Sequence, residues 1–162
     1  MSSPTFSAAS VNAGEGLGFH LLLPGATAAR PASGERVVLL HGWLQSSDMW
    51  LTTAARLRDV YGHDVLLVDW WGHGRSLPEP GDLDAAMCVG SLEAQLKGVL
   101  RRYGWDVGAP LVVVGCSMGG AVALRLAACT DPHWRGRVGR LVRGAYPFPP
   151  TQKNSHADVS LV

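Results

Sequence analysis

The chain has 162 residues, of which 47% are hydrophobic, and its 14 basic and 13 acidic residues give a net charge of +1. This length and composition fit a single globular domain, and the balanced charge excludes the basic surface that nucleic acids and anionic membranes require. Cys88, Cys116 and Cys129 are unevenly spaced, so we expect neither a disulfide framework nor a metal site, and no cofactor. With no membrane-length apolar run and no secretory pattern in residues 1–20, we expect a cytoplasmic protein without a membrane span.

The first half of the chain predicts strands that alternate with helices. Two β-like runs, 5–11 and 17–23, flank a turn at 12–16 and predict a hairpin. The apolar runs 36–40 and 65–69 are typical of strands buried on both faces of a parallel sheet. Between them, helical spacing predicts a helix over about 49–61, which ends at Gly62.

The second half continues the alternation. An amphipathic helix is expected from Leu92 to Tyr103, a strand over 111–114, a helix ending near Thr130 and a strand over 138–142. Alternating elements of this kind predict an α/β fold with a mostly parallel sheet and helices on both faces. Ligands bind at the carboxyl ends of the strands in such sheets.

One turn at such a strand end carries a reactive group. Ser117 lies between an apolar strand and a helix, and Gly115 and Gly119, two positions away on either side, are small enough to allow a cramped backbone. The turn would aim the serine hydroxyl at the first N–H groups of the helix, where negative charge is stabilised. The pattern G-x-S-x-G also arises by chance, but its setting between strand and helix favours a nucleophile. A phosphate-binding loop is excluded because Ala121, not lysine, follows Gly120.

Three landmarks occur in order: His41-Gly42 after one strand, Asp69-x-x-Gly72-His73-Gly74-Arg75-Ser76 after the next, and Gly115-x-Ser117-x-Gly119-Gly120. Together they resemble the α/β-hydrolase superfamily, and the likeness covers residues 5–143. The resemblance implies that Ser117 is a nucleophile that forms an acyl enzyme. It also implies an oxyanion hole made of the N–H groups of Met118 and Trp43, with Leu44 as the alternative to Trp43.

The same resemblance implies structural roles for the two earlier loops. His41, Gly42, Gly72, His73 and Gly74 would brace the site, and Asp69 would accept N–H bonds from the turn 72–74. Four tryptophans follow the strand ends and suggest a pocket for a small apolar ester; they are Trp43, Trp50, Trp70 and Trp71. The alternative, that most of these tryptophans pack helices onto the sheet, stays open.

The acid and the base of the catalytic triad are harder to find. In this superfamily they follow the serine, and the late candidates here are His156 and Asp158. Some members place the acid after the strand that follows the helix next to the serine, which allows Asp158, but His156 has no strand to position it at Ser117. We therefore expect residues 1–143 to be the N-terminal part of a hydrolase domain whose last strands and lid are missing, through truncation, splicing or a frame error. Residues 144–162 are expected to form a disordered tail, proline-rich and then polar. An uncovered sheet edge would then favour self-association.

The leading hypothesis is a serine hydrolase by ancestry that acts on carboxylic esters, lipids, thioesters or small amides and is inactive or impaired in this form. The alternative is a non-catalytic protein that binds small molecules or interacts with other proteins on a hydrolase scaffold.

Overall fold

The computed structural model describes residues 10–12, 20–23, 35–76 and 86–144. Within these ranges, six strands form one sheet in the order β1-β2-β4-β3-β5-β6. The strands are β1 (Ser10–Asn12), β2 (His20–Leu23), β3 (Arg36–Leu40), β4 (Asp64–Val68), β5 (Leu111–Cys116) and β6 (Val138–Gly144). Strands β4, β3, β5 and β6 are parallel, and β1 and β2 add an antiparallel hairpin. The expected mostly parallel sheet is confirmed.

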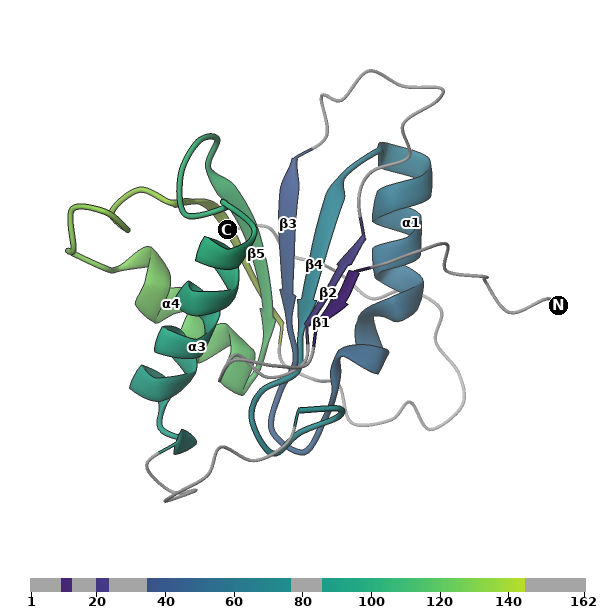
Figure 1. Ribbon diagram of the computed structural model, residues 1–162, viewed down its shortest axis with the longest axis horizontal. Coiled ribbons are helices and arrows are strands. Elements are labelled where there is room, and N and C mark those ends of the chain that lie inside the picture. Colours follow the sequence, from purple (N-terminus) through teal and green to yellow (C-terminus); the bar gives the residue numbers. More distant parts are fainter. Residues whose placement is uncertain (1–9, 13–19, 24–34, 77–85, 145–162) are drawn as a thin grey trace, which may run out of the picture.

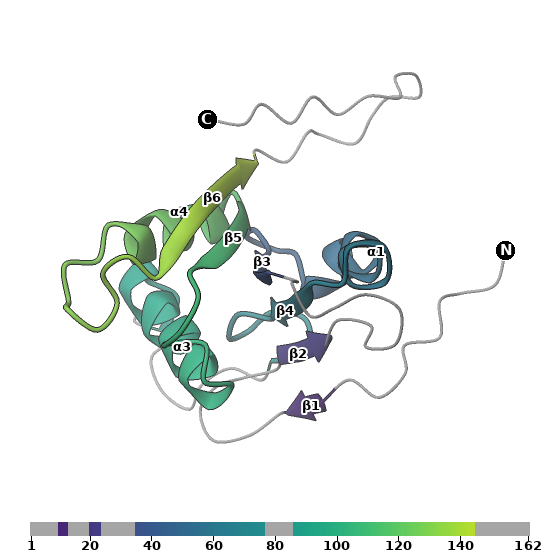
Figure 2. The same ribbon diagram turned by 90° about the horizontal axis from the view of Figure 1, so that it is seen from above.

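Helices cover both faces of the sheet (Figure 1). A short 3₁₀ helix, η1 (Ser47–Trp50), leads into α1 (Leu51–Tyr61) on one face. Helices α3 (Val89–Arg102) and α4 (Met118–Ala127) lie side by side on the other face, as Figure 2 shows from above. The loops after β3 and β4 and the start of α4 meet at one end of the sheet (Figure 1). This is the end at which the sequence places its candidate site.

The core follows from the alternation of side chains along the buried strands. In β3, Val38 and Leu40 face the α3 and α4 side, whereas Val37 and Leu39 face α1. On the side of α3 and α4, helix α3 contributes four fully buried side chains to the core, and these are Leu92, Leu96, Val99 and Leu100. Two apolar layers therefore hold the sheet from both sides and fix the strand ends that carry the site.

Element boundaries differ from the expectations at several ends. The helix expected from 49 becomes α-helical only at Leu51, because the Ser46 side chain accepts the Asp48 N–H at 3.3 Å and caps the preceding 3₁₀ turn. Gly62 ends α1 as expected, in the left-handed conformation (φ 71°). Helix α4 ends at Ala127, before Thr130, and β5 and β6 each extend two residues beyond the expected ends.

The hairpin expected from 5–11 and 17–23 is confirmed where it is described, because Val11 pairs with Leu21 in antiparallel register. Its other residues lie outside the described ranges. The expected tail, 144–162, also lies outside them apart from Gly144, the last residue of β6. Strand β6 forms one edge of the sheet as far as the structure describes it.

Candidate active site

Ser117 lies at a strained junction between β5 and α4. Its backbone has φ 48° and ψ −112°, and Leu44 is the other non-glycine residue with positive φ among those described. A serine rarely adopts this conformation, so the surrounding structure must hold it. The Ser117 N–H donates to the Gly144 carbonyl at 3.1 Å, and the residue is exposed to solvent. The turn therefore presents the serine hydroxyl above the carboxyl end of the sheet.

The glycines around Ser117 have no room for a side chain. A Cβ at Gly115 would lie 2.5 Å from the Gly119 carbonyl oxygen, and one at Gly119 would lie 2.6 Å from the carbonyl oxygens of Leu40 and His41. A Cβ at Gly120 would lie 2.8 Å from Cγ of Arg143. Close backbone approach thus explains why small residues occupy these positions.

The loop after β3 passes directly beside Ser117. A Cβ at Gly42 would lie 3.3 Å from the Ser117 Cβ. Gln45 holds this loop, since its Oε1 accepts the Gly42 N–H at 3.0 Å and its own N–H donates to the Gly42 carbonyl at 3.3 Å. Trp43 follows Gly42 and is 54% exposed. On the other side of the serine, Met118 opens α4, so its N–H has no acceptor within the helix.

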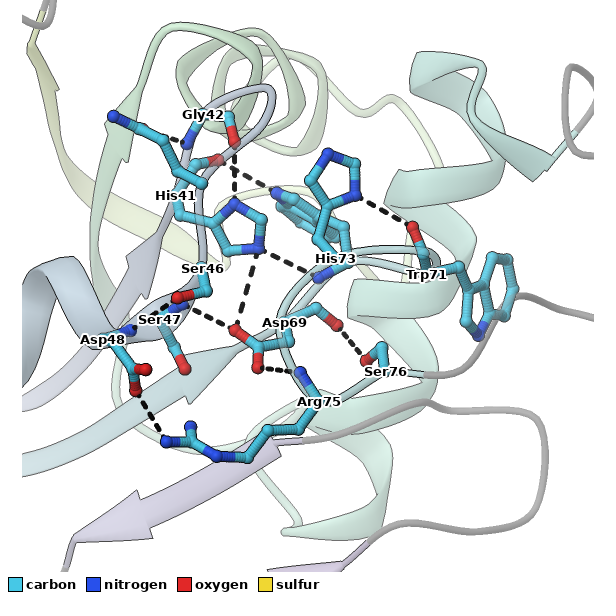
Figure 3. Close-up of polar contacts among 12 residues, drawn as sticks. His41, Gly42, Ser46, Ser47, Asp48, Asp69, Trp71, His73, Arg75 and Ser76 are labelled. Carbon is cyan, nitrogen blue, oxygen red and sulfur yellow. Dashed lines mark hydrogen bonds and ion pairs between the residues drawn. The ribbon is translucent and has the colours of Figure 1, made fainter.

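His41 is a buried structural residue (Figure 3). Its Nε2 accepts the backbone N–H of Trp70 at 3.1 Å, so Nδ1 carries the proton and donates to the Gly42 carbonyl at 2.8 Å. Burial lowers the pKa of His41, against the opposing effects of the Gly42 bond and the nearby Asp69 carboxylate. The ring is therefore neutral, and its two nitrogens join the loops after β3 and β4.

Asp69 anchors the same two loops. Its Oδ1 accepts the Ser47 N–H at 2.6 Å and its Oδ2 accepts the Arg75 N–H at 2.9 Å. The donors expected within 72–74 are thus corrected to Ser47 and Arg75, because the turn directs the N–H of Arg75 at the carboxylate (Figure 3). Gly74 has φ 53°, and a Cβ there would overlap the Asp69 carboxylate, which leaves room for glycine alone.

His73 lies in the loop after β4 and is 8% exposed. Its Nδ1 faces the Trp71 carbonyl oxygen at 3.0 Å, and its ring lies 5.4 Å from the His41 ring and 5.2 Å from the Trp43 ring. Gly72, which precedes it, has φ 71°. The His73 ring thus packs against the loop after β3, and neither histidine has a hydrogen bond to Ser117 in the part of the chain that the structure describes.

The four tryptophans separate into two groups. Trp70 is fully buried in the core and donates its indole N–H to the His41 carbonyl at 3.0 Å, and Trp50 packs against the layer under α1. These two pack helices and loops onto the sheet, so a surface pocket cannot include Trp70. Trp43 is exposed and Trp71 is partly exposed, and both remain candidates for contact with a ligand.

Two glutamines of this region, Gln45 and Gln95, were not predicted from the sequence as site residues. Gln95 is 1% exposed on α3, where its Oε1 accepts the Trp71 N–H at 3.4 Å and its Nε2 donates to the Asp69 carbonyl at 3.3 Å. A polar residue between Leu92 and Leu96 in an apolar stripe was the available signal, since buried polar groups need partners. Gln45 carried no comparable signal.

Neither a metal site nor a membrane-spanning helix is found among residues 10–12, 20–23, 35–76 and 86–144. No group of three or more metal-ligating side chains occurs there. No helix in these ranges is long and apolar enough to cross a bilayer. The late candidates for the triad, His156 and Asp158, lie outside the described residues.

A mostly parallel sheet covered on both faces, with a strained serine at a strand-to-helix turn, defines an α/β-hydrolase type of fold. The chain belongs to the alpha/beta hydrolase family, whose family model matches residues 37–159. Among curated proteins it is 37% identical over 101 residues to the dihydrolipoyllysine-residue acetyltransferase component of an acetoin cleaving system from Cupriavidus necator, covering 61% of this chain and 24% of that protein. It is 34% identical to lipase LipV from Mycobacterium tuberculosis, covering 60% and 33% of the two chains.

A further relative is the pimeloyl-[acyl-carrier protein] methyl ester esterase of Stenotrophomonas maltophilia, 33% identical over 68% of this chain and 39% of the esterase. The chain thus spans about a quarter to two fifths of the length of these relatives. Among solved structures, an alpha/beta hydrolase from Novosphingobium aromaticivorans has a TM-score of 0.66 at 19% identity, covering 87% of this chain and 45% of that one. That likeness shows the fold alone.

Proposed function

We propose that Ser117 is the nucleophile of a hydrolase site that acts on carboxylic esters. The observation that carries the proposal is the strained backbone of Ser117 at the start of α4, held by close contacts at Gly115 and Gly119. Strain of this kind is retained where it serves a function. Support for the ester class comes from relatives named as a lipase and a methyl ester esterase.

In the proposed reaction the Ser117 hydroxyl attacks the ester carbonyl. The oxygen–acyl bond forms, the alcohol leaves with a proton, and water later releases the acid. The negative carbonyl oxygen would lie between the N–H groups of Met118 and Trp43. Removal of one such donor costs about 3 kcal/mol in related enzymes.

The proton of Ser117 needs a base, and the histidines whose side chains are described are engaged elsewhere. His41 joins two loops and His73 contacts the Trp71 carbonyl. His63 accepts the Glu35 N–H at 2.9 Å, and His133 pairs with Asp106 at 2.9 Å. In a serine protease, loss of the histidine lowers turnover by about 10⁶. We therefore propose that this chain reacts slowly unless His156 reaches the serine.

A fluorophosphonate probe tests the nucleophile. We expect it to label the wild-type chain at Ser117 and to leave Ser117→Ala unlabelled. Ser91→Ala, a substitution in the first turn of α3, is the matched control and should label like the wild type. Equal labelling of the wild type and Ser117→Ala would reject a nucleophilic role for this serine.

The base is tested separately by comparing His156→Ala with His133→Ala. If His156 supplies the base, its removal alone lowers the labelling rate. If both variants label at the wild-type rate, the base is not His156, and the impaired form of the proposal stands.

A second candidate function is non-catalytic binding of an apolar ligand. It is favoured by the structural engagement of His41, His73 and Asp69, which leaves the serine without a base in the described ranges. A ligand-induced rise in melting temperature that is equal in the wild type and Ser117→Ala, with no ester turnover by the wild type, would support this function. Measurable turnover would exclude it.

A further inference from the structure

One nitrogen of His73 is buried without a partner beside the candidate site. The Trp71 carbonyl oxygen at 3.0 Å can only accept, so Nδ1 of His73 carries the proton and Nε2 carries a lone pair. Among the described residues nothing donates to Nε2, and water has no access to this atom. Figure 3 shows the contact of one ring nitrogen with Trp71 and no contact to the other. A buried polar atom of this kind needs an explanation.

The side chain that packs against the His73 ring is largely exposed to solvent. The Trp43 ring meets the His73 ring edge-on, with centroids 5.2 Å apart and planes at 69°, yet Trp43 is 54% exposed. Rotation of this indole would remove its contact with the His73 ring without disturbing the core, because the Trp43 side chain belongs to neither core layer. His73 itself stays fixed by its bond to the Trp71 carbonyl.

The surroundings of His73 favour a neutral donor. The neighbouring His41 ring, 5.4 Å away, is neutral because both of its nitrogens are used in hydrogen bonds to the backbone. The Asp69 carboxylate is fully buried and is engaged by the backbone N–H groups of Ser47 and Arg75. A lone pair flanked by aromatic rings therefore suits the hydroxyl of an apolar or aromatic alcohol.

We propose that Nε2 of His73 accepts a hydrogen bond from the hydroxyl of a bound aromatic alcohol, with the Trp43 indole moving aside to form one wall of the subsite. The inference rests on the proposed function in one respect, because an alcohol is the leaving group of ester hydrolysis. The inference specifies the chemistry of this leaving group, which is an uncharged hydroxyl on an apolar or aromatic molecule.

Phenol and anisole form a matched pair of probes, since they share an aromatic ring and only phenol donates a hydrogen bond. Long-range proton–nitrogen NMR of the wild-type chain reads the His73 ring nitrogens directly. We expect phenol, and not anisole, to move the Nε2 resonance to lower frequency. We also expect phenol to bind about fivefold more tightly than anisole, as one hydrogen bond would predict.

Two variants sharpen the test. Trp43→Ala removes the indole that contacts the His73 ring and should increase the Nε2 response to phenol. His73→Phe keeps an aromatic ring and should reduce the preference for phenol to about one, whereas His133→Phe, at the opposite end of the sheet, should keep it. If His73→Phe fails to fold, the wild-type resonance and Trp43→Ala still decide.

Equal binding of phenol and anisole, or an Nε2 resonance that phenol leaves unmoved, would overturn the proposal. Its failure is distinguishable from failure of the proposed function. Ser117→Ala should retain the Nε2 response to phenol. If the wild-type chain is not labelled by the fluorophosphonate but its Nε2 resonance still responds to phenol, the nucleophilic role of Ser117 is rejected and the subsite at His73 is supported.

Discussion

Gly119→Ala tests the close packing that holds Ser117 in place. The new Cβ would lie 2.6 Å from the carbonyl oxygens of Leu40 and His41, whereas ordinary contacts begin at 3.4 Å, so it falls short by about 0.8 Å (3.4 − 2.6). These oxygens cannot easily move, because Leu40 is paired with both β4 and β5. Overpacking costs about 1–3 kcal/mol, and the preference of helices for alanine offsets about 0.5–1 kcal/mol. The difference of the two ranges is a net loss of about 0–2.5 kcal/mol, and because the contacts are with backbone oxygens we expect the upper half of that range.

Gly90→Ala is the matched control, since this glycine also lies in a helix, α3. Its Cβ would meet nothing closer than 3.8 Å, so alanine should stabilise the chain by about 0.5–1 kcal/mol. Urea unfolding followed by far-ultraviolet circular dichroism measures both changes. The midpoint should fall for Gly119→Ala and rise for Gly90→Ala. A Gly119→Ala chain as stable as the wild type would refute the packing argument at the turn.

Two further predictions concern buried carboxylates. Asp69→Asn replaces one of two accepting oxygens with a donor, so we expect a loss of about 1–3 kcal/mol in urea unfolding, whereas Asp48→Asn, at an exposed ion pair, should change stability by less than about 1 kcal/mol. For Glu93, burial acts to raise the pKa, but the ion pairs with Lys97 and Arg125 outweigh it and hold the pKa below the usual carboxyl value. Its stabilising contribution is therefore present at neutral pH and is lost as the pH falls through the folded-state pKa. The urea midpoint of the wild type should fall more between pH 7 and about pH 3 than that of Glu93→Gln, and parallel pH profiles would contradict this.

Much of the site could be predicted because it depends on short-range patterns. The apolar run 36–40 coincides with β3, and Gly62 and Ser117 have the positive φ angles that their turns require. The role of Asp69 as a loop anchor was also correct in kind. Its donors were not, because Ser47 lies 22 residues earlier and meets Asp69 only after β3 and β4 pair.

Residue type alone could not separate the tryptophans. Trp70 and Trp71 are adjacent in sequence, yet the first is wholly buried and the second is partly exposed. The difference arises because the indole of Trp70 turns under the loop to reach the His41 carbonyl, a partner 29 residues away. The buried Nε2 of His73 could not be predicted either, since its burial depends on how the loops pack around the ring.

The sequence by itself determined the succession of strands and helices along the chain, the glycine positions around Ser117 and the resemblance to the α/β-hydrolase family. These follow from the spacing of hydrophobic residues and the placement of glycines, which are local properties of the chain. Only the tertiary structure decided which polar groups meet. It engaged His41 and Asp69 in joining two loops, and it placed Gly42 beside Ser117 while leaving one nitrogen of His73 without a partner. The physical reason is that hydrogen bonds between loops depend on strand pairing across the sheet, which brings together residues that are distant along the chain.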